Sequence, residues 1–135
     1  MGTIQVTLED IPIIYIKSDR GVTGSKQAFD KLESKLQTLR GRKFYGVIFG
    51  VPPNDEYWAS VATVASDNSV RLDLKTGVIP GGRYIQTKLF DWTKKIDLVG
   101  KIFEDLSKQF PIDSSRPGVE FYRSMDELVI RLPIK

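Results

Sequence analysis

Two stretches of the chain carry apolar residues at the spacing of an amphipathic helix. In residues 25–39 these positions are Phe29, Leu32, Leu36 and Leu39, and in residues 96–110 they are Ile96, Val99, Phe103, Leu106 and Phe110. One face of an α-helix recurs every three or four residues, and glycine or proline often ends the helix. Gly41 follows the first stretch and Pro111 the second. We therefore expect one helix in each half of the chain.

Runs of β-branched and aromatic residues surround both expected helices. In the first half they occupy residues 11–18, 43–50 and 56–65, and in the second half residues 81–90, 118–124 and 127–134. Between the halves, Val70, Leu72 and Leu74 alternate with charged residues, which predicts a half-buried strand over residues 68–77. The order strand, helix, strand, strand thus occurs twice, over residues 11–65 and 81–134. We predict a single α+β domain, with two main helices on an antiparallel sheet of about seven or eight strands.

Composition narrows the chemistry that this domain can perform. The 135 residues are 41% hydrophobic and 27% charged, and they include no cysteine and no histidine. Disulfides, thiolate nucleophiles, imidazole bases and the usual zinc, copper and haem ligands are therefore excluded, and we expect no cofactor. No apolar run is long enough to span a bilayer, and the N-terminal residues lack the features of a signal peptide, so we expect a cytoplasmic protein that binds no membrane.

The net charge of +3 comes from interleaved basic and acidic residues. The dense basic cluster of Arg40, Arg42 and Lys43 follows the first expected helix, where the helix dipole favours positive charge. We interpret it as a solvated helix terminus and expect no nucleic-acid binding by the domain itself.

Glu120 is the candidate functional residue, because it lies in a strand that is otherwise apolar and aromatic. Successive side chains of a strand alternate between its faces, so Glu120 shares its face with Tyr122, while Val119 and Phe121 take the other. If Val119 and Phe121 point at the helices, Glu120 lines the opposite surface. A buried carboxylate costs several kcal/mol unless it is paired, so a site that keeps one is suited to a cation. The alternative is a solvent-facing Glu120 bridged to Arg123 or Arg131.

Aromatic rings would supply the other half of a site for a lipophilic cation, because ring faces attract positive charge. The candidates are Tyr45, Tyr57, Trp58, Tyr84, Trp92 and Tyr122. Tyr57 and Trp58 are adjacent in a strand, so they point to opposite faces. Trp92 lies at a strand-to-helix junction, where a bulky ring can cover a cleft. Each of the other rings is also consistent with an ordinary place in the core.

Several stretches, in their order along the chain, resemble the GyrI-like small-molecule-binding domain, which also serves as the effector-binding module of AraC-type and MerR-type transcription activators. They are the YGV strand at residues 45–47, VIPGGRYIQTKLF at 78–90, GVEFYRS at 118–124 and ELVIRLPIK at 127–135. The resemblance covers nearly the whole chain. It implies two strand-helix-strand-strand modules in a pseudo-two-fold arrangement, with a ligand cleft near their junction. Glu120 matches the family's buried glutamate, which meets cationic lipophilic ligands.

Two kinds of function fit these observations. The first is a stand-alone, non-catalytic binder of lipophilic, often cationic small molecules, as in multidrug sensing or sequestration. The second is a hydrolase of cyclopropanoid or related electrophilic genotoxins, an activity of similar stand-alone proteins, with Glu120 as the acid or base. The stretch KLFDWTKK at residues 88–95 differs from the family pattern and favours the binder.

Weaker hypotheses are inhibitory binding to a protein such as DNA gyrase, which the resemblance suggests, and a glycosidase-like carboxylate pair of Glu120 and Glu127.

Overall fold

The computed structural model describes residues 2–51 and 53–135, and it has the predicted α+β architecture. The strands are β1 (Thr3–Leu8), β2 (Ile11–Lys17), β3 (Phe44–Phe49), β4 (Glu56–Ala62), β5 (Lys75–Ile79), β6 (Gly82–Phe90), β7 (Gly118–Tyr122) and β8 (Glu127–Pro133). The helices are α1 (Ser25–Lys35), α2 (Ser69–Leu72) and α3 (Ile96–Gln109), with short 3₁₀ turns η1 (Gly21–Gly24) and η2 (Trp92–Lys94).

All eight strands form one antiparallel sheet in the order β1-β6-β8-β7-β3-β4-β2-β5. The two modules, β2-α1-β3-β4 and β6-α3-β7-β8, meet where β3 pairs with β7, and Val47 lies opposite Val119 there. Read from one end, the strand order runs through the second module and then the first, and read from the other end it runs through the corresponding strands of the first module and then the second. This symmetry confirms the pseudo-two-fold arrangement. Each strand that precedes a module, β1 or β5, pairs with the first strand of the other module.

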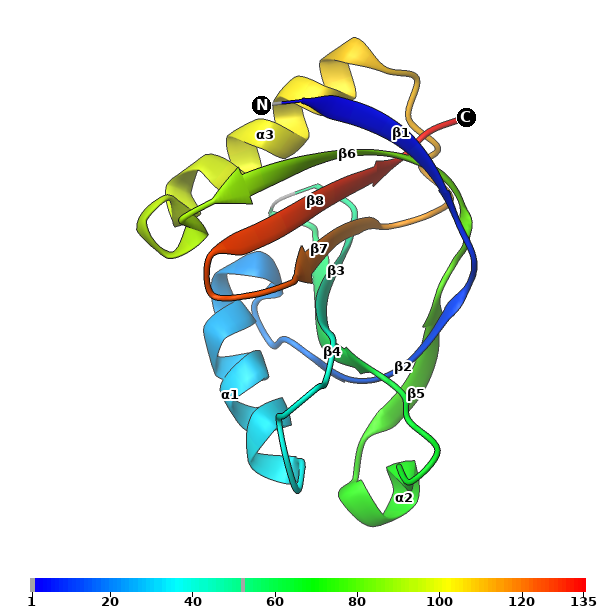
Figure 1. Ribbon diagram of the computed structural model, residues 1–135, viewed down its shortest axis with the longest axis vertical. Helices are drawn as coiled ribbons and strands as arrows, with labels where there is room; N and C mark the ends of the chain where they lie inside the picture. Colours follow the sequence, from blue (N-terminus) through cyan, green and yellow to red (C-terminus); the bar gives the residue numbers. More distant parts are fainter. Residues whose placement is uncertain (1, 52) are drawn as a thin grey trace.

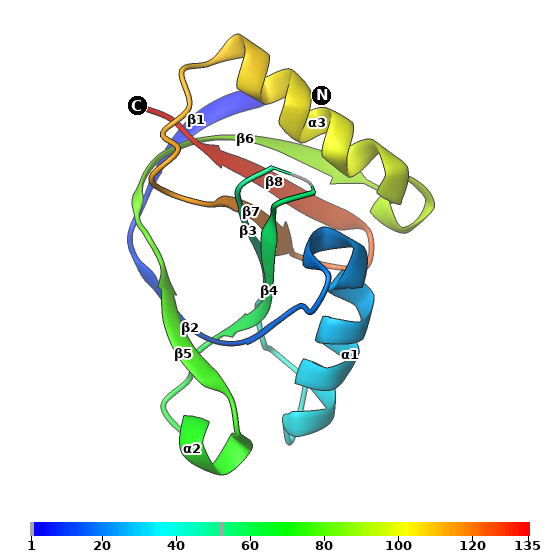
Figure 2. The same ribbon diagram turned by 180° about the vertical axis from the view of Figure 1, so that it is seen from behind.

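The sheet is strongly curled, and α1 and α3 lie outside the curl (Figures 1 and 2). We call the face that carries these helices the helix face and the opposite one the inner face. On the helix face, α1 contributes Ala28 and Leu32 to a cluster with β2 and β4, and α3 contributes Leu106 to a second cluster with β6 and β8. The inner face holds a third cluster built from strand residues alone, among them Ile13, Val47 and Val119.

The prediction of a strand over residues 68–77 is wrong for the first half of this segment. Residues Ser69–Leu72 form the single turn α2, and Val70 is 89% exposed. The Asn68 side chain accepts a hydrogen bond from the Arg71 N–H, and Asp73 takes a left-handed conformation with φ of 55°. This local capping ends the turn before β5 begins.

Two further boundaries differ from the sequence prediction. Helix α1 ends at Lys35, because Leu36 is already extended, and Leu39 is 43% exposed on the connection that follows. The strand β1 was not predicted, although Ile4, Val6 and Leu8 alternate with polar residues. No helix in the described ranges is long and apolar enough to cross a membrane.

The basic cluster after α1 contributes to the fold. Arg42 forms an ion pair with Asp67 at 2.8 Å, and both side chains are almost completely buried. The same guanidinium donates to the Ala62 carbonyl, so it ties this connection to the end of β4.

Candidate functional site

Glu120 lies on the central strand β7, directly opposite Gly46 of β3, where the two modules meet. Val119 belongs to the inner-face cluster and Phe121 packs against it, so Glu120 and Tyr122 point to the helix face. The sequence leaves this orientation open. The arrangement considered there, with Val119 and Phe121 pointing at the helices, is the opposite of the arrangement in the structure. The carboxylate therefore sits between the sheet and the two helices.

Two tyrosine hydroxyls hold the Glu120 carboxylate. Tyr57 of β4 donates to Oε1 at 2.7 Å, and Tyr122 of β7 donates to the same oxygen at 2.8 Å. Glu120 is 5% exposed and Tyr57 is completely buried. Within the described residues, no side chain forms an ion pair with Glu120, and Oε2 accepts no hydrogen bond. The carboxylate is thus buried and hydrogen-bonded, but its charge has no counterion.

Gly46 leaves the space that this arrangement needs. A Cβ atom at position 46 would overlap the Tyr57 hydroxyl and the Glu120 Oε1. The two hydrogen-bonded groups therefore lie across the backbone of β3, where any larger residue would displace them. A glycine in a central strand weakens its packing, and close approach of other groups is a common reason for its presence.

Burial dominates the electrostatics of the three groups. It raises the pKa of Glu120 above its ordinary value, although the hydrogen bonds from Tyr57 and Tyr122 work in the opposite direction. Burial and the nearby carboxylate also raise the pKa of Tyr57 and of Tyr122 well above that of a free phenol. Both phenols act as donors to the carboxylate.

Two further rings, Phe29 and Trp92, pack from the helix side against the tyrosines that hold Glu120. Phe29 of α1 packs edge-on against Tyr122 and Tyr57, with ring centroids 5.3 and 6.2 Å apart. Trp92, in the turn η2 before α3, packs edge-on against Tyr122 at 5.1 Å, and its indole N–H donates to the Ser124 carbonyl at 2.9 Å. Aromatic rings from both modules therefore surround the carboxylate.

The six candidate aromatic residues divide between the two faces of the sheet. Tyr57 and Tyr122 donate hydrogen bonds to Glu120, and Trp92 packs against Tyr122. Tyr45, Trp58 and Tyr84 pack in or against the inner-face cluster, away from Glu120. Tyr45 stacks on Phe121 at 4.8 Å and Trp58 stacks on Tyr15 at 3.9 Å. The strand period of two residues explains this division, because the neighbours Tyr57 and Trp58 cannot share a face.

The charged residues weighed as partners of Glu120 are engaged elsewhere. Glu127 pairs with Arg123 at 3.3 Å. Arg131 lies over the Phe121 ring on the inner face and donates to Gln86. The solvent-facing alternative for Glu120 is therefore wrong.

Phe29 is the contributor that sequence reasoning missed as a site residue. The sequence pattern predicts Phe29 only as a member of the apolar stripe of its helix, and that stripe does contact the sheet. Nothing in the spacing indicates which member of the stripe lies over the module junction, since this depends on how the helix is placed.

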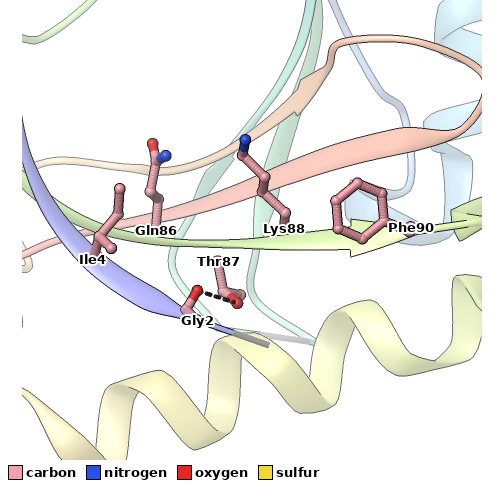
Figure 3. Close-up of a pocket in the computed structure, with 6 residues that line it drawn as sticks. All are labelled: Gly2, Ile4, Gln86, Thr87, Lys88 and Phe90. Atoms are coloured by element: carbon pink, nitrogen blue, oxygen red, sulfur yellow. Dashed lines mark hydrogen bonds between the residues drawn. The ribbon is translucent and has the colours of Figure 1, made fainter.

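Two surface pockets lie away from Glu120. One, of about 250 Å³, is lined by residues of β6 and the start of β1, including Ile4, Lys88 and Phe90 (Figure 3). The other, of about 620 Å³, is a polar groove between β2, α1 and the start of β5. Neither pocket is lined by Glu120, Tyr57 or Tyr122.

Comparisons with known proteins identify the fold. Protein-family models give no match to the chain, and neither do the sequences of curated proteins. Solved structures do match. An integron cassette protein from the mobile metagenome of Vibrio cholerae has a TM-score of 0.74 at 11% identity, covering 99% of this chain and 96% of its own.

Two further structures carry functional descriptions. SAV2435, solved with tetraphenylphosphonium bound, has a TM-score of 0.66 at 15% identity, covering 100% of this chain and 94% of its own. A hydrolase from Listeria innocua has a TM-score of 0.63 at 10% identity, covering 98% and 91%. At such identities the likeness shows a shared fold, and this chain's function has to be argued from its own site.

Proposed function

We propose that this protein is a GyrI-like binder of lipophilic cations, with Glu120 as the counterion of the ligand. One observation carries the proposal: Glu120 is a buried carboxylate whose only hydrogen-bond partners among the described residues are two neutral phenols. Folding an uncompensated charge into the interior is unfavourable. A cation bound beside Oε2 would remove that cost, and the gain would appear as binding free energy.

The surrounding rings favour a cation with an apolar surface. Phe29, Tyr57, Tyr122 and Trp92 offer aromatic faces and edges around the carboxylate. Aromatic faces attract cations and exclude water, which strengthens the attraction to the carboxylate. A small, strongly hydrated ion would lose its water shell without replacement, so the site favours a diffuse charge such as an aryl phosphonium.

A ligand would enter past the more exposed rings of the site. Tyr122 and Trp92 are half-buried, whereas Tyr57 is completely buried. We therefore assign Tyr57 to the fixed wall of the site and the Tyr122 and Trp92 rings to its cover. The bound tetraphenylphosphonium in the similar fold of SAV2435 supports this ligand class.

The test is the substitution Glu120→Gln, which keeps the shape of the side chain and removes its charge. We expect the affinity for tetraphenylphosphonium, measured by calorimetry, to fall by about 10- to 100-fold, corresponding to about 1 to 3 kcal/mol. The neutral triphenylphosphine oxide should bind wild type and variant about equally.

The matched control is Glu127→Gln, which removes a carboxylate that lies in the same sheet and already pairs with Arg123. It should change the affinity by less than about twofold. Equal binding of tetraphenylphosphonium by wild type and Glu120→Gln would contradict the proposal, as would its failure to bind the wild-type protein.

A second candidate is hydrolysis of a strained electrophile such as a cyclopropane, favoured by the raised pKa of Glu120, which suits proton transfer. In that case the wild-type protein would turn over such a substrate, and Glu120→Gln would reduce turnover by about 100-fold or more while still binding it. If the wild-type protein shows no turnover, binding without catalysis is the candidate function that remains.

A further inference from the structure

The strand β1 is an edge of the sheet without the usual protection against pairing. It pairs with β6 on one side only and ends the strand order. Its sequence, TIQVTL, contains no charged residue, proline or glycine. Natural proteins usually protect exposed edges with charges, prolines or bulges, because the unpaired N–H and C=O groups recruit another strand.

The other edge of the sheet, β5, carries a charge and a glycine and is followed by a proline. These residues are Lys75, Gly77 and Pro80. The turn α2 lies directly before it. Free pairing is therefore hindered at β5 and open at β1.

The hydrogen-bond pattern shows which β1 residues present their backbone outward. The Ile134 N–H donates to the Arg83 carbonyl, so the odd-numbered residues of β6 direct their backbone groups toward β8. The even-numbered residues then face β1, where Gln86 is opposite Ile4 and Tyr84 is opposite Val6.

Ile4 and Val6 direct their backbone N–H and C=O groups toward β6. Because backbone groups alternate in direction along a strand, the groups of β1 that point away from the sheet belong to its odd-numbered residues. These are Thr3, Gln5 and Thr7, all of which are exposed.

The side chains of β1 are also sorted by face. Val6 and Leu8 pack against the inner-face cluster, and Ile4 stands beside Gln86 and Lys88 in Figure 3 while Thr87 points to the other side. Ile4 is 55% exposed, which leaves an apolar side chain uncovered on this edge. The threonines and Gln5 form the opposite, polar row.

We propose that the β1 edge pairs with β1 of a second copy of this chain, antiparallel about a two-fold axis through Gln5. In this register Gln5 faces Gln5 of the other copy and Thr3 faces Thr7, so every outward backbone group finds a partner. Ile4 then lies opposite Val6 in a non-hydrogen-bonded pair, where side chains approach most closely. β-branched pairs and threonine pairs both stabilise cross-strand contacts, and with no charge on the strand nothing repels the second copy.

The proposal is tested by a charge swap at the two-fold axis. Gln5→Lys and Gln5→Glu each place like charges directly opposite one another, and residue 5 is exposed, so the monomer fold is not affected. In sedimentation velocity over a range of concentrations, we expect a wild-type dimer. Each variant should raise the dissociation constant by about fivefold or more. An equimolar mixture of the two variants should associate at least as well as wild type.

The control is Thr76→Lys, which adds a charge to the β5 edge and should leave the dimer unchanged. A wild-type protein that stays monomeric at high concentration would overturn the proposal, and would leave the edge to a different partner. A wild-type dimer that neither Gln5 variant weakens would overturn it too, because association would then use another surface. A mixture that fails to recover association would refute the register. None of these outcomes depends on whether Glu120 binds a cation.

Discussion

The two strands that meet at the centre of the sheet carry nearly the same four residues. Residues 46–49 read Gly-Val-Ile-Phe, and residues 118–121 read Gly-Val-Glu-Phe. With Val47 opposite Val119, the pseudo-two-fold axis relates Ile48 of the first module to Glu120 of the second, and both point to the helix face. The same place in the fold thus holds an apolar residue in one module and a carboxylate in the other.

This difference separates what the fold needs from what the site needs. Ile48 shows that an apolar side chain satisfies the architecture at this position, so packing alone does not require a glutamate. In the second module the carboxylate comes with Tyr57 and Tyr122 as donors and with Gly46 as the residue that leaves them room. The protein therefore buries a charge at Glu120 but not at the equivalent Ile48, and a local loss of stability of this kind is typical of a functional site.

The largest effect should come from Gly46 of β3, and Gly118 of β7 is its matched comparison. Gly46→Ala would drive a methyl group into the Tyr57 hydroxyl and the Glu120 carboxylate, and we expect a loss of about 3 kcal/mol in the free energy of unfolding. Gly118→Ala would bring its Cβ to 3.1 Å from the edge of the Phe103 ring, and should cost about 1 kcal/mol. Urea denaturation measures both. Equal losses would mean that the site at Gly46 yields as readily as the core at Gly118.

A smaller effect is expected when Glu120 is made neutral like its counterpart. Glu120→Gln should raise the free energy of unfolding at neutral pH by about 1 to 2 kcal/mol, because it removes a buried charge. Burial raises the pKa of Glu120, so between the glutamate pKa of the unfolded chain and the raised pKa of the folded state the native protein keeps a proton that the unfolded chain releases.

Wild-type stability should therefore fall as the pH rises through that interval, and the variant should lack this component. Denaturation series at several pH values measure the difference. A variant that is less stable than wild type at neutral pH would show that the ionised carboxylate is stabilised by its two phenols.

The smallest effect should distinguish the two donors. Tyr57→Phe and Tyr122→Phe each remove one hydrogen bond to Oε1, at about 0.5 to 1.5 kcal/mol, and each should raise the pKa of Glu120 further. Tyr57 is completely buried and Tyr122 is half-buried, so the loss of stability should be greater for Tyr57→Phe. The Tyr122 variant should change the rate of cation binding as well, since this ring belongs to the proposed cover. Stopped-flow fluorescence with a cationic dye would show whether the binding rate changes in Tyr122→Phe and not in Tyr57→Phe.

The sequence alone was enough for most of the fold and for singling out Glu120 as the candidate site residue. The spacing of Phe29, Leu32 and Leu36 predicted α1, and the alternation around Glu120 placed this carboxylate and Tyr122 on one face. These inferences succeed because helix and strand periods are properties of the local backbone. Local patterns fail where two structures satisfy them equally. At residues 68–77 the alternation was compatible with a strand, but the Asn68 cap and the left-handed Asp73 produced a helical turn.

Only the tertiary structure decided which rings surround Glu120. The strand period fixes that Tyr57 and Trp58 point in opposite directions, but it does not say which direction leads to the helices. That choice depends on where α1 and α3 pack, and their packing brings Phe29 and Trp92 to Tyr122 while it leaves Tyr45, Trp58 and Tyr84 on the inner face. The site is assembled from residues far apart in the chain, and its contacts follow from long-range packing that no local period encodes.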